Sequence, residues 1–303
     1  MAAGPNPDLM RPASGYALVS AAAVLWGSLG VAVRLTTASG VGVFEASAWR
    51  AGLAFAGALA AAAVLHGRQL VVPRKDLALF GAYGLVSIAL FFLAYFTAIE
   101  RTTVATAAVL LYTAPAWVAA LSRLLFAEEL SGAKLLSLLL AFAGCTLVMR
   151  AYQPSALRAD LPGVLAGLAS GLTYGLYSIF GKVALRRHPP LVVLTYALGF
   201  GTVFLVLIGL AAGVPLVRFL PSAVAHAVGP LLYLGLVTTL AAQWLYVAGL
   251  RTVQASRASI VATVEPVVAG LLGYAVFGET LEPPQLVGAA SVVAGAVLAQ
   301  VRR

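Results

Sequence analysis

A single acidic residue, Glu265, lies near the middle of the apolar stretch Ser259–Leu281 and directly precedes Pro266. A charge at the centre of a bilayer costs at least about 2.5–3.5 kcal/mol, and ionisable residues at that depth usually mark a transport pathway. Apolar surroundings favour the neutral form of the carboxyl group. We therefore expect Glu265 to carry a coupling proton or to face an ammonium group of a solute. The alternative is structural: a protonated carboxyl that binds the backbone carbonyl left without a donor by Pro266.

Arg50 is the second charged residue expected inside a membrane helix, about two turns into the apolar segment 44–65. Buried arginines either line a pathway, pair with an acid, or extend their long side chain to the membrane interface. Glu45 lies five residues earlier, which is a poor spacing for a pair on one helix face. Any acidic partner of Arg50 is therefore expected on another helix.

Aromatic and polar side chains in other apolar segments are candidates for the wall of a cavity. Transport cavities combine aromatic walls with a few polar groups, although Trp and Tyr also collect at membrane interfaces. Trp26 and Tyr174 are the strongest candidates, because they lie mid-segment and occupy equivalent positions in the two halves of the chain. With Glu265, the predicted substrate-binding residues are Trp26, Ser28, Tyr95, Tyr112, Tyr174, Tyr177, Gln243 and Trp244.

The sequence predicts no metal site and no cofactor. His66, His188 and His226 lie at segment edges, and Cys145 is the one cysteine, so no ligand cluster or internal disulfide is expected. The string Gly175–Lys182 is one residue too long for a phosphate-binding loop, and no Ser or Thr follows it. ATP-driven transport by this chain alone is therefore not expected.

The composition is that of a membrane protein. Of the 303 residues, 62% are hydrophobic and 10% are charged, whereas soluble domains carry about 25% charged residues. The apolar segments are continuous instead of alternating, which favours helices over a β-barrel. We predict an all-α integral membrane protein with ten transmembrane helices, at 15–34, 44–65, 77–99, 103–122, 132–150, 162–182, 191–212, 226–249, 256–277 and 284–301.

The two halves of the chain are related by a repeat. At an offset of 151, Pro115, Phe126, Glu128 and Leu130 match Pro266, Phe277, Glu279 and Leu281; at 148, Gly15, Trp26, Gly27 and Arg34 match Gly163, Tyr174, Gly175 and Lys182. Because each half has an odd number of segments, five, the second half enters the membrane from the other side. The two halves therefore form an inverted repeat, as in many secondary transporters. The predicted organisation is a disordered tail over 1–14 and five-helix repeats over 15–150 and 162–301.

The prolines and acidic residues that the repeat relates each have a structural and a functional interpretation. Pro115 and Pro266 kink their helices, either as hinges for alternating access or as fixed bends that shape a cavity. Glu128 and Glu279 precede the start of the next helix, whose positive end a carboxylate stabilises. The alternative for both acids is a contact in a gate.

The net charge of +9 does not indicate a nucleic-acid partner, because the basic residues lie mostly at helix ends. Their excess in alternate loops predicts that both termini are cytoplasmic. The expected location is the cell (inner) membrane, with the lipid bilayer as surroundings. The Gly163–Gly175 stripe, with glycine at every fourth position, predicts close helix packing. Faces of small residues serve contacts within one chain and between chains, so a homo-oligomer is a possible partner state.

Eight short strings are distributed over residues 15–301: Leu25–Ser28, Trp49–Ala51, Tyr95–Ile99, Pro115, Phe126–Leu130, Tyr246–Leu250, Glu265–Pro266 and Gly278–Leu281. In their order and spacing they resemble the EamA-type, ten-helix members of the drug/metabolite transporter superfamily. The resemblance implies export or exchange of small metabolites such as amino acids.

The predicted function is a secondary transporter, specifically an exporter of small-molecule substrates such as amino acids or drug-like amines, that works by alternating access at the repeat interface. The alternative is a membrane channel or scaffold without coupled transport. An enzyme is less favoured, because it needs several ionisable groups near one interface. The charged residues expected in the middle of helices are only Glu265 and Arg50.

Overall fold

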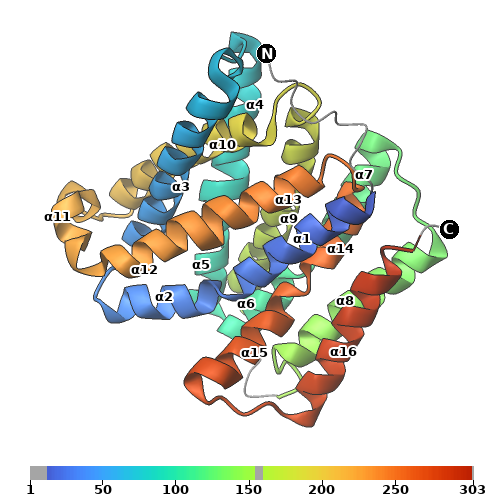
Figure 1. The fold of residues 1–303 in the computed structure, drawn as a ribbon. Coiled ribbons are helices and arrows are strands. Elements are labelled where there is room, and N and C mark those ends of the chain that lie inside the picture. Colours follow the sequence, from blue (N-terminus) through green and yellow to red (C-terminus); the bar gives the residue numbers. More distant parts are fainter. Residues whose placement is uncertain (1–11, 154–159, 302–303) are drawn as a thin grey trace.

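The computed structural model describes residues 12–153 and 160–301, and the regular elements in these ranges are all helical (Figure 1). Eight helices or helix pairs are long and apolar enough to cross a membrane, and the shorter apolar helices Gly132–Val148 and Pro283–Leu298 complete ten. The predicted ten-helix, all-α fold is thus confirmed. The predicted disordered tail lies almost entirely outside the described residues.

The helices of the first repeat begin and end as follows: α1 Pro12–Gly27, α2 Leu29–Ala38, α3 Val43–His66, α4 Arg74–Gly84, α5 Phe91–Arg101, α6 Val104–Leu111, α7 Ala114–Phe126 and α8 Gly132–Val148. Those of the second are α9 Leu161–Ala184, α10 Pro190–Ala211, α11 Pro221–Val224, α12 Val228–Leu232, α13 Ala242–Gly249, α14 Ala255–Ala262, α15 Glu265–Phe277 and α16 Pro283–Leu298. Short 3₁₀ turns at Gly67–Leu70, Leu216–Phe219 and Ala225–Ala227 lie between them. Two π-helical segments, Leu85–Leu90 and Tyr233–Ala241, interrupt the third and eighth membrane helices.

The internal repeat is visible in the helix boundaries themselves. Helices α6 and α7 begin and end 151 residues before α14 and α15, at both ends of each helix. Helices α5 and α13 also begin 151 residues apart, and a π-helical segment precedes each of them. The offset read from single residues therefore holds for whole elements.

Pro115 and Pro266 divide the fourth and ninth membrane helices in two. Each proline is the second residue of the later half-helix, α7 or α15, a position that needs no amide donor. In each preceding turn a threonine hydroxyl donates to the carbonyl three residues earlier, Thr113 to Leu110 at 2.6 Å and Thr263 to Ile260 at 2.6 Å. The predicted kinks are therefore breaks, each followed by a new helix N-terminus inside the membrane.

The first membrane helix is broken as well, which the apolar run 15–34 did not indicate. It divides at Ser28 into α1 and α2, and the Ser28 hydroxyl donates to the Leu25 carbonyl at 2.7 Å. Its repeat partner α9 runs unbroken over Leu161–Ala184. The two repeats thus differ locally.

Glycines bring the two repeats into backbone contact. A Cβ on Gly27 would lie 3.0 Å from the Glu265 carbonyl, and one on Gly175 would lie 3.2 Å from the Ala114 carbonyl. These are equivalent contacts, because Gly27 matches Gly175 and Glu265 matches Ala114. The predicted packing role of the α9 glycine stripe is confirmed here.

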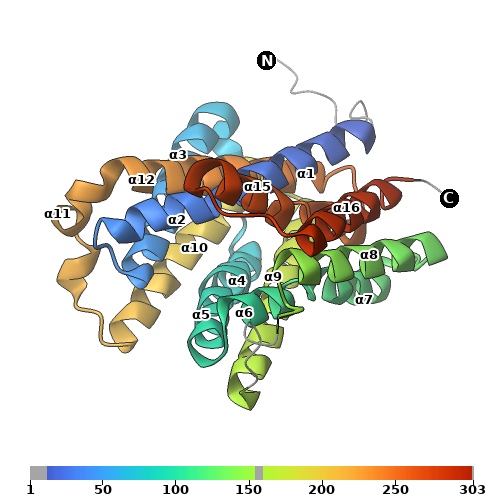
Figure 2. The ribbon, with the colours of Figure 1, turned by 90° about the horizontal axis from the view of Figure 1, so that it is seen from below.

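Helices α8 and α16 pack side by side in both ribbon views (Figures 1 and 2). A Cβ on Gly144 would lie 2.6 Å from the Gly288 carbonyl, and one on Gly288 would lie 2.7 Å from the Gly144 carbonyl. This pair therefore depends on glycine from both helices.

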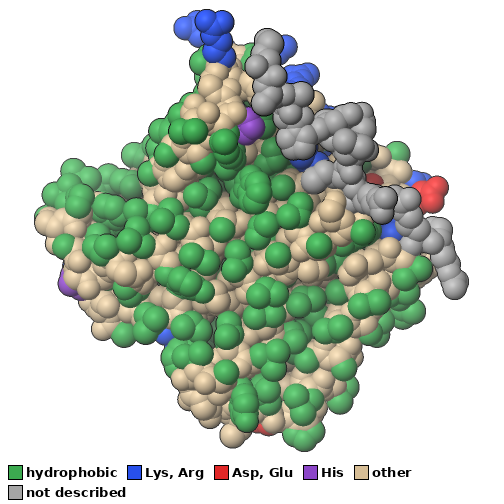
Figure 3. Space-filling model, viewed as in Figure 1, with side chains coloured by type: hydrophobic (Ala, Val, Ile, Leu, Met, Phe, Trp, Pro, Cys, Tyr) green, Lys and Arg blue, Asp and Glu red, His purple; other side chains and the backbone are tan. Residues whose placement is uncertain are grey.

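The start of α1 and the end of α16 lie on one side of the molecule, which we call the termini side; the other is the opposite side (Figure 1). In the space-filling view, Lys and Arg side chains gather at the top and right edges, and apolar side chains cover the middle (Figure 3). In this view the basic side chains thus lie mostly toward the termini side, next to a broad apolar surface.

Candidate functional site

A cavity of about 320 Å³ lies between the two repeats. It reaches from Glu265 and Tyr177 to Thr37, Val43 and Ile99, where α2 and α5 end and α3 begins, so it faces the opposite side. Of the predicted site residues, it brings together Trp26, Arg50, Tyr95, Tyr112, Tyr174, Tyr177, Gln243 and Glu265. These residues come from seven membrane helices and from both halves of the chain.

Glu265 is the first residue of α15, at the break made by Pro266. The Tyr174 hydroxyl donates to Glu265 Oε2 at 3.4 Å, which is the one hydrogen bond of this carboxyl within the described residues. The positive end of α15 favours a carboxylate, while burial favours the neutral acid. Glu265 therefore lies where the helix end and burial have opposite effects on its charge.

Arg50 lines the same cavity from α3. Within residues 12–153 and 160–301 its guanidinium has no ion-pair partner; Glu45 instead lies 4.0 Å from Arg218. The cavity thus presents one unpaired cation and one acid to a bound molecule.

Three further residues that line the cavity have a buried polar atom without a hydrogen-bond partner among the described residues: Ser87 Oγ, Tyr177 Oη and Gln243 Oε1. Buried polar atoms are nearly always satisfied, by protein or by water. These three atoms therefore keep unused hydrogen-bonding capacity in the cavity wall. Tyr177 and Gln243 were expected from the sequence and Ser87 was not.

Both π-helical segments contribute to the cavity wall, with Ser87 and Ile88 from one and Leu234 and Thr239 from the other. Such segments are uncommon and frequently lie at functional sites. The sequence analysis also missed Phe91, Phe92 and Phe96, because apolar aromatic residues in a membrane helix carry no signal of a cavity.

Two predicted site residues do not reach the cavity. The Ser28 hydroxyl donates to the Leu25 carbonyl and accepts a hydrogen bond from the Tyr233 hydroxyl at 3.0 Å. Ser28 therefore connects α1 to the eighth membrane helix. Trp244 is 40% exposed on the outer surface of α13. Its neighbour Gln243 faces the cavity, and adjacent helical residues point about 100° apart.

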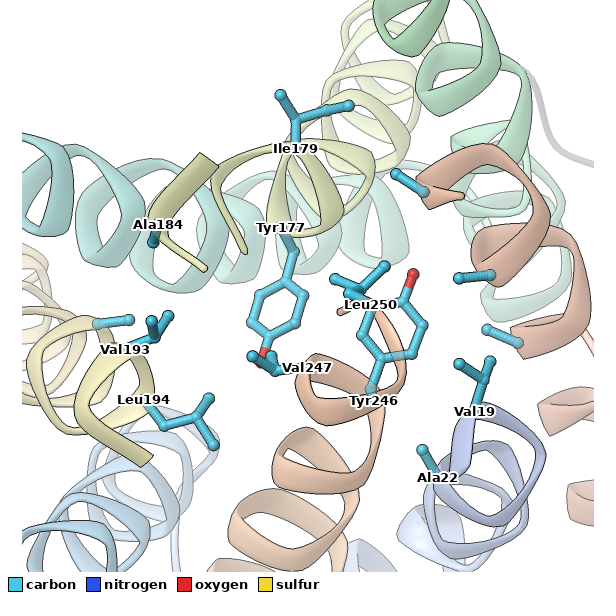
Figure 4. Close-up of a cluster of buried hydrophobic side chains, with 14 of the residues drawn as sticks. Val19, Ala22, Tyr177, Ile179, Ala184, Val193, Leu194, Tyr246, Val247 and Leu250 are labelled. Carbon is cyan, nitrogen blue, oxygen red and sulfur yellow. The ribbon is translucent and has the colours of Figure 1, made fainter. Parts of the chain in front are cut away.

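Beyond Glu265 the space narrows to a pocket of about 20 Å³, lined by Pro115, Ser178, Ser259 and Thr263 among others. A buried cluster closes the path toward the termini side. In Figure 4 the Tyr177 side chain of α9 extends to Val247 of α13, and the Tyr246 ring lies beside it. Tyr246 also bonds to Ser178 at 2.6 Å and packs on Trp26 with ring centroids 5.2 Å apart. The cavity is therefore open toward one side and closed toward the other.

Comparison with known proteins identifies the family of the chain. The model of the EamA-like transporter family matches residues 13–150 and 161–300. An uncharacterized transporter of Archaeoglobus fulgidus is 37% identical over 209 residues, 68% of this chain and 70% of its own. An uncharacterized inner membrane transporter of Salmonella typhimurium, YicL, is 25% identical over 94% of each chain.

One solved crystal structure of a protein superimposes with a TM-score of 0.81 at 22% identity, covering 95% of this chain and 96% of its own. At this identity the likeness shows the fold alone. The two family matches follow the two repeats found in the sequence and in the helix boundaries. The chain is a membrane transporter and belongs to the EamA-like transporter family.

Proposed function

We propose that this protein is a secondary transporter that exports small metabolites by alternating access at the interface of its two repeats. The observation that carries the proposal is the cavity of about 320 Å³, which reaches the opposite side and is closed toward the termini side by buried side chains. A channel needs a path open at both ends, so this closure favours a transporter. The helix breaks at Pro115 and Pro266 are the proposed hinges, because each lies beside the cavity.

The cavity chemistry favours a solute with both a cationic and an anionic group. Glu265 is placed to bind an ammonium, and the unpaired Arg50 guanidinium suits a carboxylate, which it binds through two parallel hydrogen bonds. The aromatic wall of Trp26, Tyr95 and Tyr174 suits an apolar or aromatic side group. Amino acids fit this set best, and drug-like amines would use only the Glu265 part.

Glu265 is also the proposed coupling residue. A carboxyl that gains a proton from one side and loses it on the other links transport to a proton gradient. The solute ammonium and the proton would then compete for the same oxygen atoms. Export corresponds to binding from the termini side, which we take as cytoplasmic from the distribution of basic residues, and release to the opposite side.

The test is transport by purified protein in proteoliposomes, with a panel of labelled amino acids and amines, with and without a pH gradient. We expect saturable transport of at least one amine-bearing solute and faster transport with the gradient. Ion conductance without saturation would instead identify a channel. Absence of transport for every solute of the panel would contradict the proposed substrate class.

A further inference from the structure

We propose that Glu279 and Arg34 form the gate that closes the opposite side, by repeating there the contacts that Glu128 and Lys182 make on the termini side. The proposal rests on the alternating access proposed above. It assigns both residues a positioning role in transport. Neither lines the cavity, so neither belongs to the solute site.

On the termini side, where the cavity is closed, a carboxylate of the first repeat caps a helix of the second. Glu128 follows α7 and accepts hydrogen bonds from the amides of Ala255 at 2.9 Å and Ser256 at 3.3 Å, and from the Ser256 hydroxyl. These amides open α14 and would otherwise have no partner. Lys134 adds a cation 3.7 Å from the same carboxylate, and both side chains are buried.

Lys182 completes the closure at the end of α9. Its Nζ donates to the carbonyls of Leu250 at 2.5 Å and Val253 at 2.7 Å, just past the end of α13. A cation there offsets the negative end of the helix. This contact holds α9 and α13 together next to the Tyr177 and Tyr246 cluster (Figure 4).

On the open side, the equivalent residues bind each other instead. Arg34 Nη2 lies 2.8 Å from Glu279 Oε1, and the Arg34 guanidinium lies 4.5 Å from the Phe277 ring. The two side chains are 59% and 48% exposed. Surface pairs of this kind contribute little to stability and are readily exchanged.

The backbone groups equivalent to those of the closed side are present and unused. The amides of Val104 and Ala105 at the start of α6 correspond to those of Ala255 and Ser256 at the start of α14. Within the described chain neither amide donates a hydrogen bond. The carbonyls of Ile99 and Thr102 correspond to those of Leu250 and Val253.

In an inverted repeat, the second state exchanges the arrangements of the two repeats. On closure of the opposite side, Glu279 would leave Arg34 and bind the amides of Val104 and Ala105. Arg34 would turn to the carbonyls of Ile99 and Thr102. Glu128 and Lys182 would separate from their partners on the termini side, so the two states would contain matching contacts.

The match is imperfect in a way that explains which side is open. Ala105 stands where Ser256 supplies a hydroxyl, and Gln285 stands where Lys134 supplies a cation. The opposite-side cap therefore has one donor and one charge fewer. The weaker gate is the open one, so restoring the hydroxyl with Ala105→Ser should stabilise the state that is open to the termini side.

The test measures opening of the termini side in nanodiscs, without any solute. Cys145→Ser removes the native thiol, and Ser259→Cys places a reporter thiol in the narrow pocket beyond Glu265. We expect Ala105→Ser to raise the rate of labelling by a bulky maleimide about tenfold, the effect of one charge-assisted hydrogen bond of about 1.4 kcal/mol. Glu279→Gln in the same chain should abolish that increase.

Glu100→Gln is the matched control, an exposed acid on the same side, and it should leave the increase intact. An unchanged labelling rate in Ala105→Ser, or an increase that persists with Glu279→Gln, would refute the gate. Because labelling needs no solute, the result is independent of the transport assay. Transport without the labelling response would leave the proposed function standing and remove only the gate.

Discussion

Tyr174 of α9 donates a hydrogen bond of 3.4 Å to Glu265, the first residue of α15. This bond joins the long unbroken helix of the second repeat to the half-helix that begins at Pro266. It lies between the wide part of the cavity and its closed end. A solute that binds Glu265 must therefore act on a contact between two helices that pack against different parts of the first repeat.

Tyr174→Phe tests the hydroxyl separately from the ring. The ring contacts of Tyr174 should persist, including that with Phe91 at 5.4 Å between centroids. A neutral-to-charged hydrogen bond contributes about 1.5–3 kcal/mol, so we expect solute affinity to fall at least about tenfold. Binding by the purified variant, measured by scintillation proximity, checks this. Affinity equal to that of the wild type would show that Tyr174 acts only through its ring.

Arg50→Met tests the carboxylate part of the site. We expect it to weaken binding of an amino acid at least about tenfold but to leave binding of the corresponding amine, which lacks the carboxylate, nearly unchanged. Arg50→Lys should keep part of the preference, because the charge remains. Competition of each compound against one labelled amine measures the ratio. The same loss for both compounds would mean that Arg50 supports the cavity instead of binding the solute.

Glu128→Gln tests the closed side as a structural unit. The change weakens the bonds to the α14 amides and leaves Lys134 buried without its ion-pair partner. Removing one member of a buried pair costs about 3–5 kcal/mol. Thermal unfolding in detergent should show a clearly lowered midpoint. Glu129→Gln is the control, because Glu129 is exposed, and its midpoint should stay near that of the wild type; equal midpoints for both variants would contradict the capping role.

Gly288→Ala tests the backbone contact between α8 and α16. The added Cβ would lie 2.7 Å from the Gly144 carbonyl, which forces the helices apart at a cost of about 1–3 kcal/mol. Gly30→Ala is the matched control, since a Cβ there meets nothing within 4 Å. The first variant should unfold at a lower temperature and the second should not. Equal unfolding temperatures would mean that the two helices adjust without cost.

The sequence predicted the helices and their packing well, because the same pattern of residues occurs in both repeats. Pro115 and Pro266 located the breaks in the fourth and ninth membrane helices, and the offset of 151 holds for the boundaries of α6, α7, α14 and α15. The small-residue stripe of α9 also packs as its spacing indicated. These features depend on local chemistry, so a single chain reveals them.

The cavity wall was less predictable, because it depends on which way each side chain points. Gln243 faces the cavity and Trp244 faces outward, although both lie in the same apolar segment. The π-helical segment Tyr233–Ala241 changes the rotation of the helix before these residues, and no sequence period reports that change. The break at Ser28 had the same effect on the first helix, turning Ser28 toward Tyr233.

The most direct test of the central claim is solute transport by wild type and Glu265→Gln in proteoliposomes across a range of imposed pH gradients. The account predicts that wild-type transport rises with the gradient, while the variant stays folded and shows no dependence on it. Unfolding midpoints of both proteins, measured on the same samples, establish that the variant is intact. Gradient-dependent transport by Glu265→Gln at the wild-type rate would contradict the account, because the carboxyl at the start of α15 would then have no part in coupling.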